Sequence, residues 1–156
     1  MSQESLKKAM ERAGNILSYH SLSAAQLNDR LVEKGESPED AAAVVARLLE
    51  LGYLNDLEYG RLLVRQCIGK GYGPARIRQE LRKRKLDPET VEQALEDYCS
   101  DGDKLVRFIH QKLRGDHAPD RAAVKRVTDA LFRRGYSWDE IDSALRQYME
   151  ETAEDR

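Results

Sequence analysis

The sequence predicts an all-α protein in which three tandem three-helix repeats, about nine helices in total, form an elongated curved array. The predicted repeats are residues 1–53, 54–100 and 101–156. Three observations favour this fold: a pattern recurs every 50 positions, apolar residues follow helical spacing, and capping residues stand at matching positions. Because such short helices cannot bury an apolar face alone, neighbouring repeats must pack against one another.

The recurring pattern is clearest in the second half of each repeat. Residues 26–31, 76–81 and 126–131 align without a gap at an interval of 50 positions, and in the helix that follows Tyr98 aligns with Tyr148. A fixed period of this size is typical of stacked repeats. Repeat proteins bind through extended surfaces, so we expect a binding surface rather than an enclosed pocket.

The first repeat contains three predicted helices. Apolar residues from Leu6 to Leu17 share one face of the first helix. Ser23 and Gln26 form a predicted capping box at the start of the second helix. In it, the side chain of each residue accepts a hydrogen bond from the backbone N–H of the other. Ser37, followed by a proline, caps the third.

The second repeat contains a glycine-rich break. Residues 69–74 interrupt the chain with three glycines, and a proline then restarts a helix that we expect to span residues 75–86. Gly71 and Gly73 are assigned a structural role in this turn, and Asp87 caps the next helix. The first helix of the repeat is expected to turn four residues inward: Tyr59, Leu62, Leu63 and Cys67.

The third repeat keeps the pattern with one insertion. Its first apolar stripe is offset by 46 rather than 50 positions, which places four extra residues in the loop 114–119. The second helix stops at Gly135, and Ser137 and Glu140 form another predicted capping box. The corresponding apolar stripe is Leu105, Phe108, Ile109 and Leu113.

Composition and cysteine spacing exclude several classes of protein. No run of 18 apolar residues is present, and the first residues lack an apolar secretory segment, so we expect a cytoplasmic protein that does not enter a membrane. Cys67 and Cys99 lack the spacing of a metal or redox motif, and we expect both to be reduced and packed in the interior. A monomer is expected.

Charge is strongly segregated, although the formal net charge is only −2. Residues 61–86 contain nine basic side chains and one acidic one, and residues 104–134 contain nine and three. Residues 1–60 contain six basic and ten acidic side chains, and residues 87–103 contain no basic and seven acidic ones. Pairing between neighbouring helices explains part of this, but the excess indicates a basic stripe suited to phosphate or an acidic protein surface.

The basic helix 75–86 is the strongest candidate for a binding surface. With Ile77 turned inward, Arg78, Arg82 and Lys85 fall on one outer face. Arginine suits bidentate contact with phosphate or carboxylate, although a solvated helix without a partner would have the same composition. The residues predicted to contact a partner are Arg76, Arg78, Arg82, Lys83, Arg84, Lys125, Arg126, Arg133 and Arg134.

The sequence contains no convergent set of catalytic or metal-binding groups. His20, His110 and His117 lie in different contexts and lack the close spacing of a zinc site. The glycines of residues 69–73 lack the spacing of a phosphate-binding loop, and no strand precedes them. We therefore expect no enzymatic activity, no cofactor and no bound metal.

Four motifs occur in order in the second repeat and just before it: Gly52-Tyr53-Leu54-Asn55-Asp56, Tyr59, Gly71-Tyr72-Gly73 and residues 76–81. Together they resemble the central signature of the RecX family, which are regulators of the RecA recombinase. The likeness runs from about Leu6 to Tyr148. It departs from the family pattern at residues 84–86, where members often have Lys-Gly after the basic helix.

The resemblance implies tandem three-helix units without catalytic activity. It implies binding in the deep groove of the RecA–DNA filament, and restraint of filament growth, ATPase, strand exchange and coprotease activity. DNA phosphate is a second expected contact. On this interpretation, reversing Arg78 and Arg82 to Glu abolishes inhibition of RecA with the fold intact, whereas Tyr53, Leu54 and Tyr59 join the first two repeats.

Two alternatives stay open at the level of sequence. A sequence-nonspecific nucleic-acid-binding helical repeat protein would bind mainly through phosphate, because Asn and Gln side chains that could read bases are sparse on the basic face. Its binding would weaken steeply with salt. The other alternative is a protein-interaction scaffold unrelated to recombination, against which only the family resemblance argues.

Overall fold

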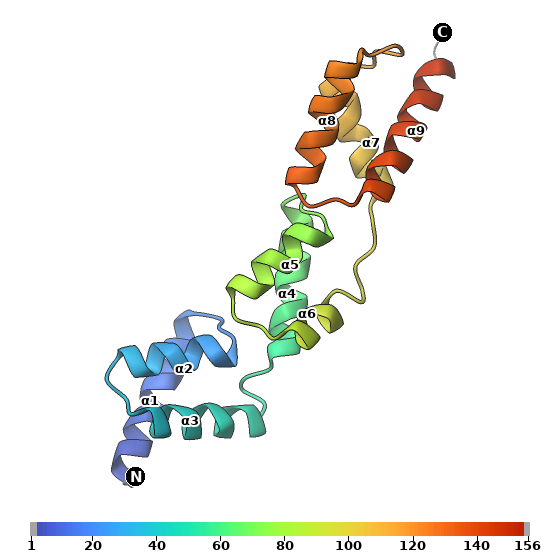
Figure 1. The fold of residues 1–156 in the computed structure, drawn as a ribbon. Helices are drawn as coiled ribbons and strands as arrows, with labels where there is room; N and C mark the ends of the chain where they lie inside the picture. Colours follow the sequence, from blue (N-terminus) through green and yellow to red (C-terminus); the bar gives the residue numbers. More distant parts are fainter. Residues whose placement is uncertain (1–2, 155–156) are drawn as a thin grey trace. The chain divides into compact units, whose positions relative to one another are not determined.

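The computed structural model describes residues 3–154, and over this range the chain folds into nine α-helices and no strand (Figure 1). The predicted all-α class and the number of helices are therefore confirmed. The two compact units into which these helices fall are described separately below, and the predicted repeat boundaries remain predictions. The helices are α1 (Gln3–Tyr19), α2 (Ala24–Glu33), α3 (Pro38–Glu50), α4 (Asp56–Gly69), α5 (Pro74–Lys83), α6 (Pro88–Ala94), α7 (Gly102–Leu113), α8 (Arg121–Arg133) and α9 (Trp138–Glu154).

The first compact unit runs to Arg65 and includes Glu80–Glu96. Its main core lies where α1, α2 and α3 pack together (Figure 1). Ala9 and Ala13 are fully buried there, because small side chains let the neighbouring helices approach closely. The predicted apolar face of α1 is confirmed, and the core comprises Ala9, Ala13, Ile16, Leu27, Leu31, Ala41, Val44, Val45, Leu48 and Leu54.

The second compact unit comprises Gln66–Gln79 and the chain from Asp97 onward. Its core lies between α7, α8 and α9, and Tyr148 of α9 is fully buried in it. The Tyr148 hydroxyl donates a hydrogen bond of 2.6 Å to the carbonyl of Asp116, so the long loop before α8 is tied to this core. The core comprises Leu105, Val106, Ile109, Leu113, Val127, Leu131, Tyr136, Ile141, Ala144 and Tyr148.

Capping residues fix where the helices begin. In the capping box of α2, the Gln26 N–H donates to Ser23 Oγ at 3.2 Å and the Ser23 N–H donates to Gln26 Oε1 at 3.0 Å. The same reciprocal pair joins Ser137 and Glu140 at α9, with distances of 3.2 and 2.9 Å. Both predicted capping boxes are confirmed, and each satisfies two backbone donors that the helix itself leaves unpaired.

The basic helix is shorter than the sequence predicted. α5 ends at Lys83, and Lys85 lies beyond it in a left-handed conformation with φ of 60°. The prediction that Lys85 continues the row of Arg78 and Arg82 is therefore wrong. The chain turns at Lys85 so that Leu86 can be buried, at 4% exposure, instead of continuing along the helix.

The last helix of the second repeat also stops early. α6 ends at Ala94, so Tyr98 is not helical, whereas Tyr148 at the aligned position lies within α9. Leu95 is the C-cap of α6, and two acidic residues, Glu96 and Asp97, follow it. Negative charge at a helix C-terminus opposes the helix dipole, which disfavours further turns at this point.

Three side chains are more exposed than predicted. Leu62 is 36% exposed, because α4 buries Gly60 and Leu63 instead, and a Cβ at Gly60 would lie 3.1 Å from the Cβ of Ala94. Tyr53 is 73% exposed and does not pack between repeats. Cys67 is buried as expected, but Cys99 is exposed, since it follows the early end of α6.

Candidate partner-binding surfaces

The outer side of α5 keeps part of its charge uncompensated. Ile77 and Leu81 are fully buried, which confirms the predicted inward face. Arg82 is exposed and forms no ion pair within residues 3–154, whereas Lys83 pairs with Glu80 at 3.3 Å. Arg78 is half-buried, so it is less available than Arg82 to a partner.

The segment after α5 is bound to α2 and α4 within the first unit. The carbonyl of Arg84 accepts a hydrogen bond of 2.6 Å from Ser23 Oγ, and the Arg84 guanidinium donates to the Tyr59 hydroxyl at 3.3 Å. Lys85 forms an ion pair with Asp29 of α2. Arg84, a predicted contact residue, therefore also has a structural role that sequence reasoning missed.

Two glycine turns meet backbone to backbone in the second unit. The Gly73 N–H donates to the carbonyl of Arg134 at 2.7 Å, and the Ala75 N–H donates to the carbonyl of Gly135 at 3.0 Å. A Cβ at Gly73 would lie 2.5 Å from the Tyr136 nitrogen, so no larger residue fits. We call this contact between residues 73–75 and 134–136 the glycine joint.

The glycine joint is closed by a buried tyrosine. The Tyr136 hydroxyl donates to the carbonyl of Gly71 at 2.9 Å, and Gly71 itself has φ of 84°, in the region that favours glycine. Burial raises the pKa of Tyr136, with Glu140 and Asp101 adding to the rise and Arg134 opposing it. The hydroxyl therefore stays a neutral donor to the turn at ordinary pH.

Two predicted contact residues stack on aromatic rings beside the glycine joint. The Arg76 guanidinium lies 4.6 Å from the centre of the Tyr72 ring, and that of Arg134 lies 4.5 Å from the Phe108 ring. Cation–π contacts of this kind hold a planar guanidinium in one orientation. Arg76 from the basic segment 61–86 and Arg134 from the basic segment 104–134 therefore both lie at the glycine joint.

The outer face of α8 carries the remaining predicted residues. Lys125 pairs with Asp129 at 2.8 Å, the i,i+4 spacing that places two side chains next to each other on a helix. Arg126 and Arg133 are exposed, form no ion pair within the described part of the chain, and line a shallow hollow of about 280 Å³ together with Lys112 of α7. Three cations around one hollow suit an anionic group of a partner.

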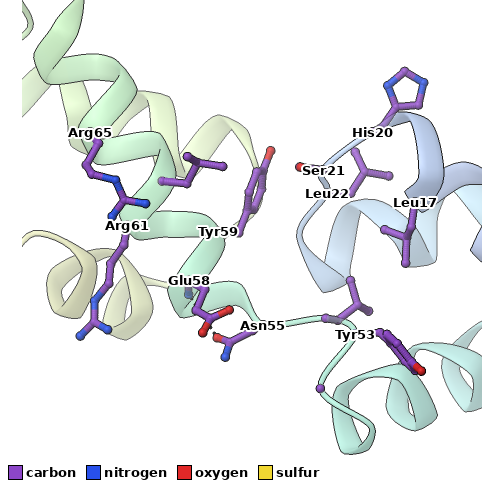
Figure 2. A pocket seen from close by; sticks show the side chains of 13 residues that line it. Leu17, His20, Ser21, Leu22, Tyr53, Asn55, Glu58, Tyr59, Arg61 and Arg65 are labelled. Carbon is purple, nitrogen blue, oxygen red and sulfur yellow. Dashed lines mark hydrogen bonds between the residues drawn. The ribbon is translucent and has the colours of Figure 1, made fainter.

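A groove in the first unit was missed by sequence reasoning. It has a volume of about 540 Å³, and its lining combines leucine side chains with Glu58, Arg61 and Arg65 of α4. Figure 2 shows Tyr59 projecting from α4 toward the loop that carries Ser21 and Leu22. Such a lining offers both apolar and charged contacts, and residues 52–55 of the family-like motif also belong to it.

The histidines do not gather into a metal site. His110 Nε2 lies 2.9 Å from a carboxylate oxygen of Glu151 and packs edge-on against Tyr148, while His20 and His117 are exposed. The residues that the structure describes include no group of three or more His, Cys, Asp or Glu placed to hold a metal ion. Over the same residues, no helix has the length and apolarity needed to cross a bilayer.

Capped three-helix groups that carry exposed cations on α5 and α8, unpaired within residues 3–154, define a helical repeat protein with basic surface regions. The chain belongs to the RecX family. Residues 9–48 match the family model for the first three-helix domain of RecX, and residues 55–95 match the model for the second. The chain is 35% identical to Regulatory protein RecX of Vibrio parahaemolyticus over 136 residues, which cover 86% of this chain and 88% of the relative. It is 33% identical to Regulatory protein RecX of Stenotrophomonas maltophilia, covering 88% and 85% of the two chains.

Solved structures show the same fold. A crystal structure of RecX from Lactobacillus salivarius superimposes with a TM-score of 0.87 at 24% identity, covering 94% of this chain and 98% of that one. A second crystal structure of a regulatory protein RecX gives a TM-score of 0.79 at 21% identity, covering 91% and 72%. Identity at this level supports the fold, and the family assignment comes from the sequence relatives.

Proposed function

We propose that this protein is a modulator of the RecA recombinase that binds the RecA–DNA filament and inhibits its ATPase, strand-exchange and coprotease activities. The observation that carries the proposal is membership of the RecX family, with a regulatory relative matched over 86% of this chain and 88% of its own. No catalytic activity of the chain itself is needed for this role, because a bound protein can restrain a polymer by occupying its surface.

The surface chemistry supports the same role. Arg82 on α5 and Arg126 and Arg133 on α8 are exposed cations without an ion-pair partner in residues 3–154. An acidic protein surface or DNA phosphate could bind these guanidinium groups without first breaking an internal salt bridge. We therefore propose that these three arginines contribute most to binding.

The other predicted contact residues have additional internal roles. Arg76 and Arg134 stack beside the glycine joint, and Lys83 and Lys125 pair with acids on their own helices. We keep these residues, with Arg78 and Arg84, in the proposed contact surface. Reversing Arg78 together with Arg82 would be an ambiguous test, because Arg78 is half-buried and its loss can disturb the fold.

The decisive experiment is a titration of this protein into RecA undergoing single-stranded-DNA-dependent ATP hydrolysis. We expect inhibition at well below one molecule per RecA, because a protein that acts on a polymer affects many subunits at once. Fluorescence anisotropy of the DNA under the same conditions checks that DNA is not being sequestered.

Two outcomes would contradict this proposal. Absence of inhibition at stoichiometric excess, with the protein folded, would remove the RecA assignment. Inhibition that appears only when DNA is depleted, and that disappears steeply with salt, would favour the sequence-nonspecific nucleic-acid-binding alternative.

A further inference from the structure

A second hollow in the first unit lies between α1 and α2, and of its lining residues only His20 also lines the groove beside Arg61 and Arg65. It has a volume of about 480 Å³, within the roughly 300–1,000 Å³ usual for ligand sites. From α1 it is lined by Arg12, Asn15 and Tyr19, which fall at i, i+3 and i+7 and so share one face of the helix. From α2 and its C-cap it is lined by Arg30 and Lys34, which are four apart and also share a face.

The charge of this hollow is opposite to that of its surroundings. Residues 1–60 carry more acidic than basic side chains, yet among the described residues no carboxylate lines the hollow. Arg12 is already engaged, since its guanidinium pairs with Glu36 at 3.1 Å and donates to the carbonyl of Lys34. Arg30 and Lys34 form no ion pair within residues 3–154, so two cations face the hollow uncompensated.

An aromatic ring stands beside these cations. Tyr19 is 85% exposed, which is unusual for a side chain with so much apolar area, and His20 next to it is exposed too. Both line the hollow, so a flat ligand could stack on the ring while its negative group reaches the cations. Aromatic faces beside a basic groove are how proteins bind single-stranded nucleic acid without reading sequence.

We propose that this hollow binds single-stranded nucleic acid, with a base stacked on Tyr19 and the adjoining phosphate on Arg30 and Lys34. Asn15 can add a hydrogen bond to a phosphate or base edge. A duplex fits less well, because its base faces are already stacked inside the helix. An acidic peptide also fits less well, because the apolar residue of the lining, Ile16, is only 8% exposed and leaves no pocket for an apolar anchor.

The inference goes beyond the proposed function and does not depend on it. Binding is measured with the full chain and a fluorescently labelled oligothymidylate, by anisotropy, at several salt concentrations and without recombinase. We expect R30E/K34E to weaken binding at least tenfold and to lower the slope of log affinity against log salt by about 1.4, which corresponds to two phosphate contacts on a single strand. Tyr19→Ala should weaken binding roughly 5- to 150-fold, the loss expected for one stacked base, whereas Tyr19→Phe should change it less than twofold.

The matched control is K7E/K8E, which changes the net charge by the same amount on α1. Lys7 and Lys8 are exposed and do not line the hollow, so we expect less than a threefold loss. Circular dichroism checks the fold of each variant. Tyr19→Ala keeps the proposal testable if R30E/K34E fails to fold, since an 85% exposed ring contributes little to stability.

Four results would overturn the proposal. The wild-type chain could fail to bind oligothymidylate at low salt, or K7E/K8E could lose as much affinity as R30E/K34E. Tyr19→Ala could bind like wild type. Polyglutamate could compete as well as unlabelled oligothymidylate at equal charge, which would assign the hollow to acidic protein segments instead.

Discussion

At the scale of single residues, Lys85 marks where this chain departs from its own repeat. Gly35 and Gly135, each 50 positions away, have φ of 103° and 95°, and Lys85 has φ of 60° at the equivalent position. A side chain in the left-handed region costs about 1–2 kcal/mol for an L-residue other than glycine. The ion pair with Asp29 and the burial of Leu86 offset this strain.

Replacing Lys85 by glycine should therefore stabilise the protein. We expect Lys85→Gly to raise the free energy of unfolding by about 0.5–1 kcal/mol, since relief of strain exceeds the loss of one exposed ion pair. Urea denaturation monitored by circular dichroism measures this change. Lys85→Ala is the control, because it removes the ammonium but keeps the strain, and it should be no more stable than wild type. A glycine variant less stable than wild type would show that the ion pair outweighs the strain.

Gly135 combines a left-handed conformation with a close backbone contact. A Cβ there would lie 2.3 Å from the backbone nitrogen of Arg76, and Gly35, with nearly the same φ, has nothing within 4 Å. Gly135→Ala should lower the free energy of unfolding by at least about 2 kcal/mol, and Gly35→Ala by only about 1 kcal/mol. Chemical denaturation compares the two. Equal losses would mean that the glycine joint contributes nothing to stability beyond backbone strain.

At the scale of helices, local chemistry explains what the sequence could predict. The starts of α2, α3 and α9 follow from side chains that cap the next turn, so they could be placed from sequence alone. The ends of α5 and α6 could not. At α5 a lysine occupies a position where glycine would have signalled the turn, and α6 ends without any glycine or proline.

The features of the candidate surfaces also divide into those that local sequence could predict and those that it could not. The inward face of α5 follows from helical spacing and was predicted correctly. The glycine joint depends on two turns 62 positions apart, Gly73 and Gly135, and the hollow beside Tyr19 depends on the packing of α1 against α2. Neither contact has a signal within one helix, so neither could be read from spacing.

The start of α9 depends on a charged carboxylate. Burial alone would raise the pKa of Glu140, but hydrogen bonds from the Ser137 N–H and the Tyr98 hydroxyl outweigh burial and hold the pKa below its usual value. The Tyr98 hydroxyl donates to this carboxylate at 2.7 Å. A carboxyl group whose pKa is lowered by folding stabilises the protein above its unfolded pKa and loses that contribution as pH falls through the folded value.

Glu140→Gln isolates this charge, because glutamine can still cap the helix. We expect the variant to be less stable than wild type by about 1 kcal/mol at pH 7, the difference between a charge-assisted and a neutral hydrogen bond on a half-buried group. As pH falls below the ordinary glutamate value of 4.5, the difference should shrink toward zero. Urea denaturation across pH 7 to 3 measures it, with Glu150→Gln on the same helix as the control. A difference independent of pH would show that the carboxylate charge is not involved.

At the scale of the whole molecule, the net charge is negative although the charge of segments 61–86 and 104–134 is positive. The formal net charge is −2 and the isoelectric point is about 6.0, so the molecule as a whole does not attract a polyanion. Salt screens exposed charges beyond about 8–10 Å, so a partner responds to the cations nearest to it. Binding to a filament should therefore depend on where the arginines stand and not on how many the chain contains.

Two variants that have the same net charge can separate the position of the cations from their number. R82E/R126E/R133E reverses the three arginines proposed to contribute most to binding, and K7E/K8E/R47E makes the same change in net charge at exposed positions of α1 and α3. In the RecA ATPase titration, we expect the first variant to need at least ten times more protein for half inhibition, and the second less than three times. The difference between the two variants in the concentration needed for half inhibition should narrow as salt rises, because screening weakens the arginine contacts that only the second variant keeps. Equal losses of inhibition in the two variants would mean that inhibition depends on net charge. The groove beside Arg61 and Arg65 would then be the next candidate for the binding surface.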